Sequence, residues 1–313
     1  MTRPFRFIAP MPRLSGSAAQ WRGELRRIED LGFHTVAVSD HFTQGWVMEP
    51  IVAMTVAAEA TTHLRVLSLV LGNDYRHPVL VHKAMATLDV LSGGRVEIGL
   101  GAGWLPGDYQ AAGLPLDPPG VRVARLAESV EVIKRLFGSD PVTFDGDHYR
   151  IADLDGLPKP VQRPHPPLLI GGGSPKVLRL AGRLADVVGI NPSLSVEAAP
   201  GTAVLDMTEQ RVAEKAGWAR EAAIRAGRAA DELEFQVSVL SLEVTDVPGA
   251  RGWTSTLAAG VTDPDVLEAS PAVLRGPAAH CAELLHKWRE QLGVNQFHLG
   301  GDPAAAAAVI ARV

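Results

Sequence analysis

The sequence predicts an α/β protein, a (β/α)8 TIM barrel with insertions. Apolar segments of strand length alternate with longer segments that carry apolar residues at helical spacing. About eight strand candidates lie outside one irregular stretch, and each has a helix after it or enough chain for one. A length of 313 residues suits a barrel of roughly 250 residues plus insertions. A doubly wound open sheet is the alternative, but it rarely uses this many regular units in one domain.

The expected elements follow one another along the whole chain. The strand candidates are residues 5–9, 35–39, 65–71, 96–99, 168–170, 186–190, 233–242 and 296–299. The helix candidates are residues 18–31, 51–60, 78–91, 121–137, 175–184, 204–226 and 278–292. Pro78 stands in the first turn of its helix, where proline is favoured, and Gly93 and Gly94 can end that helix in the left-handed conformation.

The alternation breaks between residues 138 and 167. Two short β-prone pieces, residues 142–144 and 149–151, precede the proline-dense PKPVQRPHPP. We interpret this stretch as an insertion between barrel units and not as a domain linker. The prediction is therefore one barrel domain over residues 1–313.

Composition excludes several classes of protein. The net charge of −5 and the pI of about 6.1 leave no broad basic field, so nucleic acid is not expected as a partner. The single cysteine, Cys281, cannot form an internal disulfide and falls in an apolar helical pattern. The mean hydropathy is +0.08, no run of about 18 apolar residues occurs, and the N-terminus lacks a signal-peptide core. We expect a cytoplasmic protein that does not contact a membrane.

Functional residues of a barrel lie just after its strands, and these positions are rich in candidates. They carry aromatic rings, glycines, amides and a histidine beside an aspartate. In chain order they are Asp40, His41, Trp46, Asn73, Gly101, Gly103, Trp104, Gly171, Gly172, Gly173, Ser174 and Asn191.

The run Gly171, Gly172, Gly173 and Ser174 lies between an apolar strand and a helix. Its backbone N–H groups and the helix dipole would converge on an anion, so we interpret it as a phosphate site. A tight strand-to-helix turn is the alternative. If phosphate binds here, Gly172→Asp should abolish cofactor binding and leave the fold intact.

The remaining candidates argue against several chemistries. His41 beside Asp40 could be a metal pair, an acid–base dyad or a hydrogen-bonded strand-end histidine, but no other histidine has ligand spacing, so no metal is expected. There is no Gly-x-Ser-x-Gly elbow, and Gly99, Gly101 and Gly103 do not form the GxGxxG fingerprint. A phosphate-bearing, hydride-carrying cofactor, flavin or deazaflavin, fits what remains.

Five segments together resemble the bacterial luciferase-like monooxygenase superfamily, and most closely its coenzyme F420-dependent oxidoreductase branch. The resemblance covers most of residues 1–192 in the right order, while the C-terminal third matches only in outline. The segments are SDHF (39–42), NDYRHP (73–78), LSGGRVEIGLGAGW (91–104), LPKPVQRPHPPLLIGGGSP (157–175) and AGRLADVVGINP (181–192).

The resemblance implies a cofactor at the carboxyl face of the barrel and a homodimer. The phosphate would bind Gly171 to Ser174 with help near Asn191, and Gly103 and Trp104 would shape a wall near the ring and substrate. A non-proline cis peptide would back the ring at about Ser68-Leu69. The residues expected around the ring are Asp40, His41, Ser68 and Leu69.

The function expected from this resemblance is hydride transfer between coenzyme F420 and a small organic substrate. The catalytic residues would be His41, as the base, with Trp46 and Asn73, in a pocket formed by Trp46, Asn73, Trp104 and the insertion. The chain departs from the F420-dependent glucose-6-phosphate dehydrogenases, which have a catalytic acid where Trp104 stands and a ring-adjacent tryptophan one position nearer the histidine than Trp46. The first alternative is a two-component monooxygenase that uses FMN, oxygen and a separate reductase. A lesser alternative is a non-catalytic flavin-binding protein.

Overall fold

Eight parallel strands close into a barrel in the described part of the chain, as the alternation predicts. The computed structural model describes residues 3–44, 48–193, 201–249, 252–261 and 263–313. The strands pair in the order β3, β2, β1, β14, β10, β9, β8, β5, and a further β3–β5 pairing closes the ring. The bounds are β1 (Arg6–Pro10), β2 (Thr35–Val38), β3 (Arg65–Ser68), β5 (Val96–Gly101), β8 (Leu168–Gly172), β9 (Val187–Ile190), β10 (Glu234–Val239) and β14 (Val294–Leu299).

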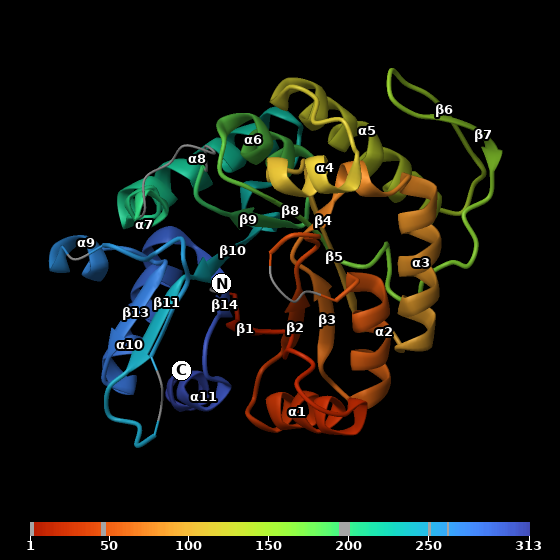
Figure 1. The fold of residues 1–313 in the computed structure, drawn as a ribbon. Coiled ribbons are helices and arrows are strands. Elements are labelled where there is room, and N and C mark those ends of the chain that lie inside the picture. The colour runs from red at the N-terminus through yellow and green to blue at the C-terminus, as the bar shows by residue number, and fades with distance from the viewer. Residues whose placement is uncertain (1–2, 45–47, 194–200, 250–251, 262) are drawn as a thin grey trace.

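Helices surround the barrel and cover its outer face (Figure 1). Each barrel strand is followed by one of them, so all the carboxyl ends of the strands open at one mouth. The bounds are α1 (Ala18–Asp30), α2 (Pro50–Ala60), α3 (Pro78–Leu91), α5 (Pro119–Phe137), α6 (Pro175–Leu184), α8 (Glu209–Arg225), α10 (Ala278–Leu292) and α11 (Pro303–Ile310). In the described residues no helix has the length and apolar character that crossing a bilayer requires.

Two smaller sheets lie outside the barrel. The irregular stretch forms the antiparallel hairpin of β6 (Val142–Asp145) and β7 (Arg150–Leu154), which projects beyond α3 and α5 in Figure 1. A second sheet follows β10. Its strands are β11 (Ser241–Val244), β12 (Trp253–Thr254) and β13 (Val273–Gly276). The shorter elements are β4 (Leu71–Gly72), η1 (Asn73–Tyr75), α4 (Pro106–Ala112), α7 (Thr202–Leu205), η2 (Ala230–Glu232) and α9 (Pro264–Glu268).

Three expected elements are each divided in the structure. The helix expected over residues 204–226 is α7 and α8, because Thr208 caps a new helix by accepting from the N–H of Arg211. The strand expected over residues 233–242 is β10 and β11, since the chain leaves the barrel and pairs with β13. The strand expected over residues 65–71 ends at Ser68, and β4 begins at Leu71.

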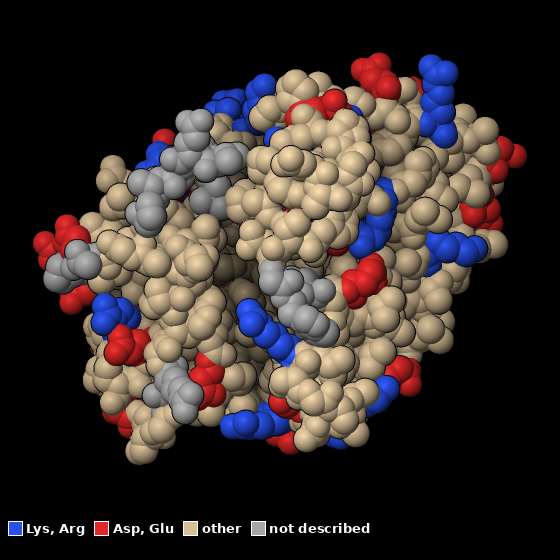
Figure 2. All heavy atoms as spheres, in the orientation of Figure 1, with Lys and Arg blue, Asp and Glu red and all other residues tan. Residues whose placement is uncertain are grey.

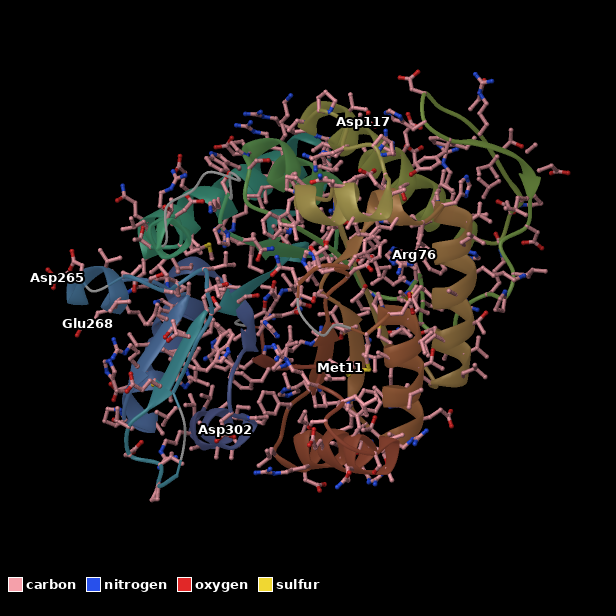
Figure 3. The ribbon with its side chains drawn as sticks, in the orientation of Figure 1. Met11, Arg76, Asp117, Asp265, Glu268 and Asp302 are labelled. Carbon is pink, nitrogen blue, oxygen red and sulfur yellow. The ribbon has the colours of Figure 1, made fainter. Side chains whose placement is uncertain are left out.

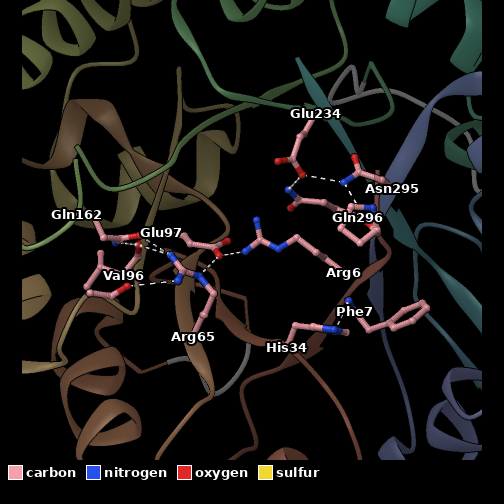
Figure 4. Close-up of polar contacts among 12 residues, drawn as sticks. Arg6, Phe7, His34, Arg65, Val96, Glu97, Gln162, Glu234, Asn295 and Gln296 are labelled. Atoms are coloured by element: carbon pink, nitrogen blue, oxygen red, sulfur yellow. Dashed lines mark hydrogen bonds and ion pairs between the residues drawn. The ribbon is translucent and has the colours of Figure 1, made fainter. Parts of the chain in front are cut away.

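Buried charges join the amino ends of the barrel strands (Figure 4). The carboxylate of Glu97 on β5 accepts hydrogen bonds from Arg6 on β1 and Arg65 on β3. Arg65 also donates to Oε1 of Gln162 at 2.8 Å, and burial lowers the pKa of both arginines. Glu97 therefore links three strands, including the two whose pairing closes the barrel.

We expect Glu97→Gln to lower the free energy of unfolding by about 3 kcal/mol, because it removes the buried carboxylate that pairs directly with two partly buried guanidinium groups. Urea unfolding of the two proteins measures this difference. Glu24→Gln, on the exposed face of α1, is the matched control and should change stability by no more than about 0.5 kcal/mol. Equal effects of the two substitutions would contradict a special role for Glu97.

Candidate functional site

His41 pairs with a buried carboxylate at the mouth of the barrel, but the partner is Asp108 and not Asp40. Nδ1 of His41 lies 2.6 Å from Oδ2 of Asp108, the third residue of α4. Asp108 is fully buried, and its Oδ1 accepts from the backbone N–H groups of Phe42 and Thr43 and from the Thr43 hydroxyl. The pKa of Asp108 is lowered, so its carboxylate is ionised near pH 7 and only accepts hydrogen bonds; Nδ1 of His41 therefore carries the proton and Nε2 is free to accept one.

The donors around Asp108 keep it ionised. Burial raises the pKa of its carboxyl group, but the hydrogen bonds from Thr43, His41 and Phe42 outweigh burial and hold the pKa below its ordinary value. No pattern in the sequence indicates this pair beyond the position of Asp108 after β5. The two residues are 67 positions apart in the sequence and become neighbours because the barrel closes.

Trp104 lies against His41 at the mouth, where the ring of the cofactor was expected. The two ring centroids are 6.0 Å apart in an edge-to-face arrangement, and 41% of the Trp104 side chain is exposed. The preceding Gly103 has a φ of +75°, and a Cβ there would lie 1.8 Å from the Tyr109 hydroxyl. Glycine at 103 is therefore required by the turn that presents Trp104.

Asp40 faces Arg76, away from His41. Its carboxylate accepts from Nη1 of Arg76 at 2.5 Å and from the N–H of Gly72 at 3.0 Å. Neighbouring residues of an extended segment point in opposite directions, which explains why Asp40 and His41 do not form the dyad that their adjacency suggested. Asp40 instead joins the end of β2 to the loop after β4.

Asn73 is buried beside the insertion. Its Nδ2 donates to the Tyr149 hydroxyl at 3.3 Å, and its Oδ1 has no partner among the described residues. Trp46, the third residue expected to be catalytic, lies outside the described residues.

The end of β3 packs tightly against β5. The Ser68 hydroxyl donates to the carbonyl of Gly99 and accepts from its N–H, at 3.0 and 2.9 Å, and Ser68 is fully buried. A Cβ at Gly99 would lie 2.0 Å from the Ser68 carbonyl oxygen, and one at Gly101 2.7 Å from Val70. The non-proline cis peptide is Leu69–Val70, one residue beyond the expected position. Gly99 and Gly101 therefore permit close contact between β5 and residues 68–70.

The glycine run at the carboxyl end of β8 is also tightly packed, and its first two glycines belong to the strand. A Cβ at Gly171 would lie 3.1 Å from Val70, one at Gly172 2.5 Å from Val177 of α6, and one at Gly173 2.4 Å from the backbone of Pro192. Gly172→Asp would therefore disturb the contact between β8 and α6, so our expectation that this change leaves the fold intact is wrong. The N-terminus of α6 follows at once, and its N-cap Ser174 makes no side-chain capping bond.

The loop after β9 is held by a buried lysine that the sequence did not indicate. Lys215 of α8 is fully buried and donates to the Asn191 carbonyl at 2.9 Å and to the Asp206 carboxylate at 2.7 Å. Asp206 also accepts from the N–H of Ser193. This arrangement places Asn191 beside Gly171, with its Nδ2 3.3 Å from the position of a Gly171 Cβ.

A cavity of about 330 Å³ opens at the mouth, above β1, β2, β3 and β14. In the ring of strands β1 is opposite β8, so the cavity faces the glycine run across the mouth. Leu69 lines it, as does His298 of β14, a residue that the sequence analysis missed. Burial lowers the pKa of His298 to about 4, so its imidazole is neutral near pH 7. Figure 2 shows the hollow near the centre of this face, with basic side chains at its edge.

We expect Asp108→Ala to lower the free energy of unfolding by about 3 kcal/mol, because buried donors lose their acceptor. Asp108→Asn should cost about half as much, since one oxygen still accepts from Phe42 and Thr43. The contribution of Asp108 is complete above about pH 4 and is lost as the pH falls through its lowered pKa in the folded protein. Urea unfolding measures both variants, with Asp30→Ala at an exposed position as the control. If Asp30→Ala lowered the free energy of unfolding as much as Asp108→Ala does, Asp108 would have no special role as an acceptor for buried donors.

Comparison with known proteins gives the family. The model of the family described as Luciferase-like monooxygenase matches residues 6–240. The FMNH(2)-dependent dimethylsulfone monooxygenase of Pseudomonas putida is 30% identical over 203 residues, 59% of this chain and 56% of that protein. The F420-dependent glucose-6-phosphate dehydrogenase of Amycolatopsis mediterranei is 34% identical over 166 residues, 51% of this chain and 49% of that protein. The matches thus span about half the length of these curated relatives.

The solved structures agree in fold. The coenzyme F420-dependent tetrahydromethanopterin reductase from Methanopyrus kandleri superimposes with a TM-score of 0.76 at 19% identity, over 99% of this chain and 98% of that one. The chain has the closed barrel of these proteins, and the family match covers most of its length. The chain belongs to the luciferase-like monooxygenase family of oxidoreductases and monooxygenases.

Proposed function

We propose that this protein is an oxidoreductase that transfers a hydride between coenzyme F420 and a small organic substrate at the barrel mouth. The observation that carries the proposal is the pair of His41 and Asp108, in which an ionised carboxylate holds the imidazole with one nitrogen free. Trp104 beside it and the cavity across the mouth offer surfaces for a ring and a substrate. The F420-dependent relatives favour the deazaflavin.

The N-terminus of α6 fits a phosphate group. This helix has ten residues, its positive dipole end faces the mouth after β8, and no side chain caps it. Gly171, Gly172 and Gly173 add no side chains of their own at this helix end. Ser174 would donate its hydroxyl and Asn191 its amide to the phosphate. Bound F420 would supply the hydride acceptor or donor, since a deazaflavin carries hydride at C5.

His41 would move the proton that accompanies hydride transfer. When an alcohol is oxidised to a carbonyl compound, its carbon loses a hydride and its oxygen loses a proton, and Nε2 of His41 accepts that proton. Asp108 holds the ring orientation and stabilises the imidazolium that results. In the reducing direction His41 returns the proton to the carbonyl oxygen. Trp104, Ser174 and Asn191 would bind and orient the cofactor and the substrate.

A second candidate is an FMN-dependent monooxygenase that uses oxygen and receives reduced flavin from a separate reductase. The FMNH(2)-dependent relative favours it, because its match covers more of this chain than the match to the F420-dependent dehydrogenase. The same phosphate site and the same His41 would serve either cofactor.

Ser174 offers a test of the phosphate site that leaves the fold intact. Aspartate is as good an N-cap as serine, so Ser174→Asp should keep the melting temperature while placing a carboxylate where phosphate binds. We expect it to weaken cofactor affinity at least tenfold, measured by fluorescence titration with F420 and with FMN. Ser174→Asn is the neutral control of the same shape and should bind within about threefold of the original protein.

The titration also separates the candidate functions. Binding of F420 with hydride exchange across an alcohol and carbonyl panel supports the first proposal. Oxygen consumption that requires reduced FMN and substrate supports the second. Tight cofactor binding without turnover would indicate a non-catalytic flavin-binding protein, and binding of neither cofactor would refute both enzymatic proposals.

We further propose a homodimer formed through the outward faces of α2 and α3. Leu80 and Leu91 are 63% and 64% exposed and lie eleven residues apart on α3, which is nearly the same helix face. Val52 of α2 is exposed to the same extent. Val161 of the insertion is also exposed, and its backbone N–H donates to Asp89 of α3. We call Val52, Leu80, Leu91 and Val161 the α2–α3 patch. A patch of this kind on a helix pair is typical of a protein interface, and a second copy supplies a matching surface.

Leu80→Glu and Leu91→Glu together should convert the dimer to a monomer, because four carboxylates would face one another across the interface. Light scattering after gel filtration at micromolar concentration measures the mass. Ile224→Glu, at a similarly exposed apolar residue of α8, is the matched control and should remain a dimer. A monomeric original protein, or dissociation by Ile224→Glu alone, would refute this interface.

A further inference from the structure

The cavity at the mouth has one charged side chain in its lining. It is Arg13, in the loop after β1, and no acidic residue lines the cavity beside it in the part of the chain that the structure describes. Arg13 forms no ion pair with any described residue. Nearby arginines are already paired, Arg76 with Asp40 and Arg125 with Asp74. An unpaired guanidinium beside a cavity favours an anionic ligand.

His298 supplies a polar but uncharged contact on the floor of the cavity. His298 of β14 pairs in register with Ile8 of the neighbouring strand β1. Its side chain has no hydrogen-bond partner among the described residues. Its imidazole remains neutral near pH 7 because burial lowers its pKa to about 4. One ring nitrogen can donate and the other can accept, so His298 can bond to a hydroxyl or a carbonyl oxygen but adds no charge.

The remaining walls are largely apolar and well supported. Met48 and Leu69 line one side, and Met11, near the centre of Figure 3, lines another. Trp253 of β12 reaches the cavity from the second sheet and packs on the glycine pair after β14. A Cβ at Gly300 would lie 2.3 Å from the Trp253 ring, so any larger residue there would displace the tryptophan. The cavity volume of about 330 Å³ suits a small organic molecule.

We propose that this cavity binds the organic substrate as a small monoanion. Its carboxylate pairs with Arg13, its apolar body packs between Met48, Leu69 and Trp253, and a second hydroxyl or carbonyl group, separate from the one whose proton His41 moves, bonds to His298. This inference rests on the proposed function for its reaction, but anion binding itself is measurable without turnover. The cofactor's own anionic groups are the competing source of the same chemistry.

The test compares carboxylates with their uncharged amides by isothermal titration calorimetry. The probes are benzoate with benzamide, hexanoate with hexanamide, and 4-hydroxybenzoate. We expect each acid to bind at least tenfold more tightly than its amide, which corresponds to about 1.4 kcal/mol. Arg13→Gln should remove that preference and leave amide binding unchanged, while Arg26→Gln, at an exposed arginine of α1, should change neither.

His298→Phe tests the second contact. The original protein should bind 4-hydroxybenzoate more tightly than benzoate by about fivefold, and the phenylalanine variant, which keeps the ring volume, should lose that difference while retaining the preference for acid over amide. Loss of acid binding altogether in this variant would contradict the assigned roles.

Four results would overturn the proposal. They are the absence of acid binding, equal binding of acids and amides, an equal loss in Arg26→Gln and Arg13→Gln, and displacement of the acid by F420 or FMN, which would assign Arg13 to the cofactor. If no cofactor binds but the acids do, the proposed function fails and the anion site stands.

Discussion

Closure of the barrel between β3 and β5 is the constraint on which the mouth depends. Glu97 holds the amino ends of these strands by binding Arg6 and Arg65, and the Ser68 hydroxyl bonds to Gly99 nearer the mouth. A parallel sheet that closes has no free edge, and its strand ends meet at one face. Without that closure His41, on the loop after β2, and Asp108, after β5, would not be neighbours.

Buried aspartates then position the loops at the mouth. Asp108 gathers the backbone of residues 42 and 43, Asp40 joins Gly72 to Arg76, and Asp206 holds Ser193. Each aspartate accepts several hydrogen bonds at once, so leaving any of them without its donors would be costly, and each fixes the backbone at a loop or strand end. The free imidazole nitrogen of His41, the N-terminus of α6 and the cavity all lie at the carboxyl ends of barrel strands. His298 in the cavity is neutral because burial lowers its pKa, and Arg13 forms no ion pair with the described residues.

The glycines of residues 99–103 and 171–173 illustrate how far a pattern can be interpreted. They lie at the carboxyl ends of β5 and β8, but Gly101, Gly171 and Gly172 belong to the strands and do not follow them, because both strands are two residues longer than expected. Their role was harder to infer, since a glycine that admits a ligand and a glycine that admits another strand look the same in a sequence. Gly99 lies against Ser68 and Gly172 against Val177, contacts made by residues 31 and 5 positions away. The pairing of His41 with Asp108 in place of Asp40 has a similar cause, because adjacency along an extended chain does not bring side chains together.

The barrel, most element bounds and the set of strand-end residues could be predicted from the sequence, because hydrophobic periodicity and helix termini are local properties of the chain. Which of those residues meet depends on how the chain folds in three dimensions. The fold paired Asp108 with His41, divided the stretches over residues 204–226 and 233–242 where the chain changes neighbours, and brought Arg13, Trp253 and His298 to one cavity. These contacts join segments far apart in sequence, and their energies depend on burial and on distance in space, which no local pattern records.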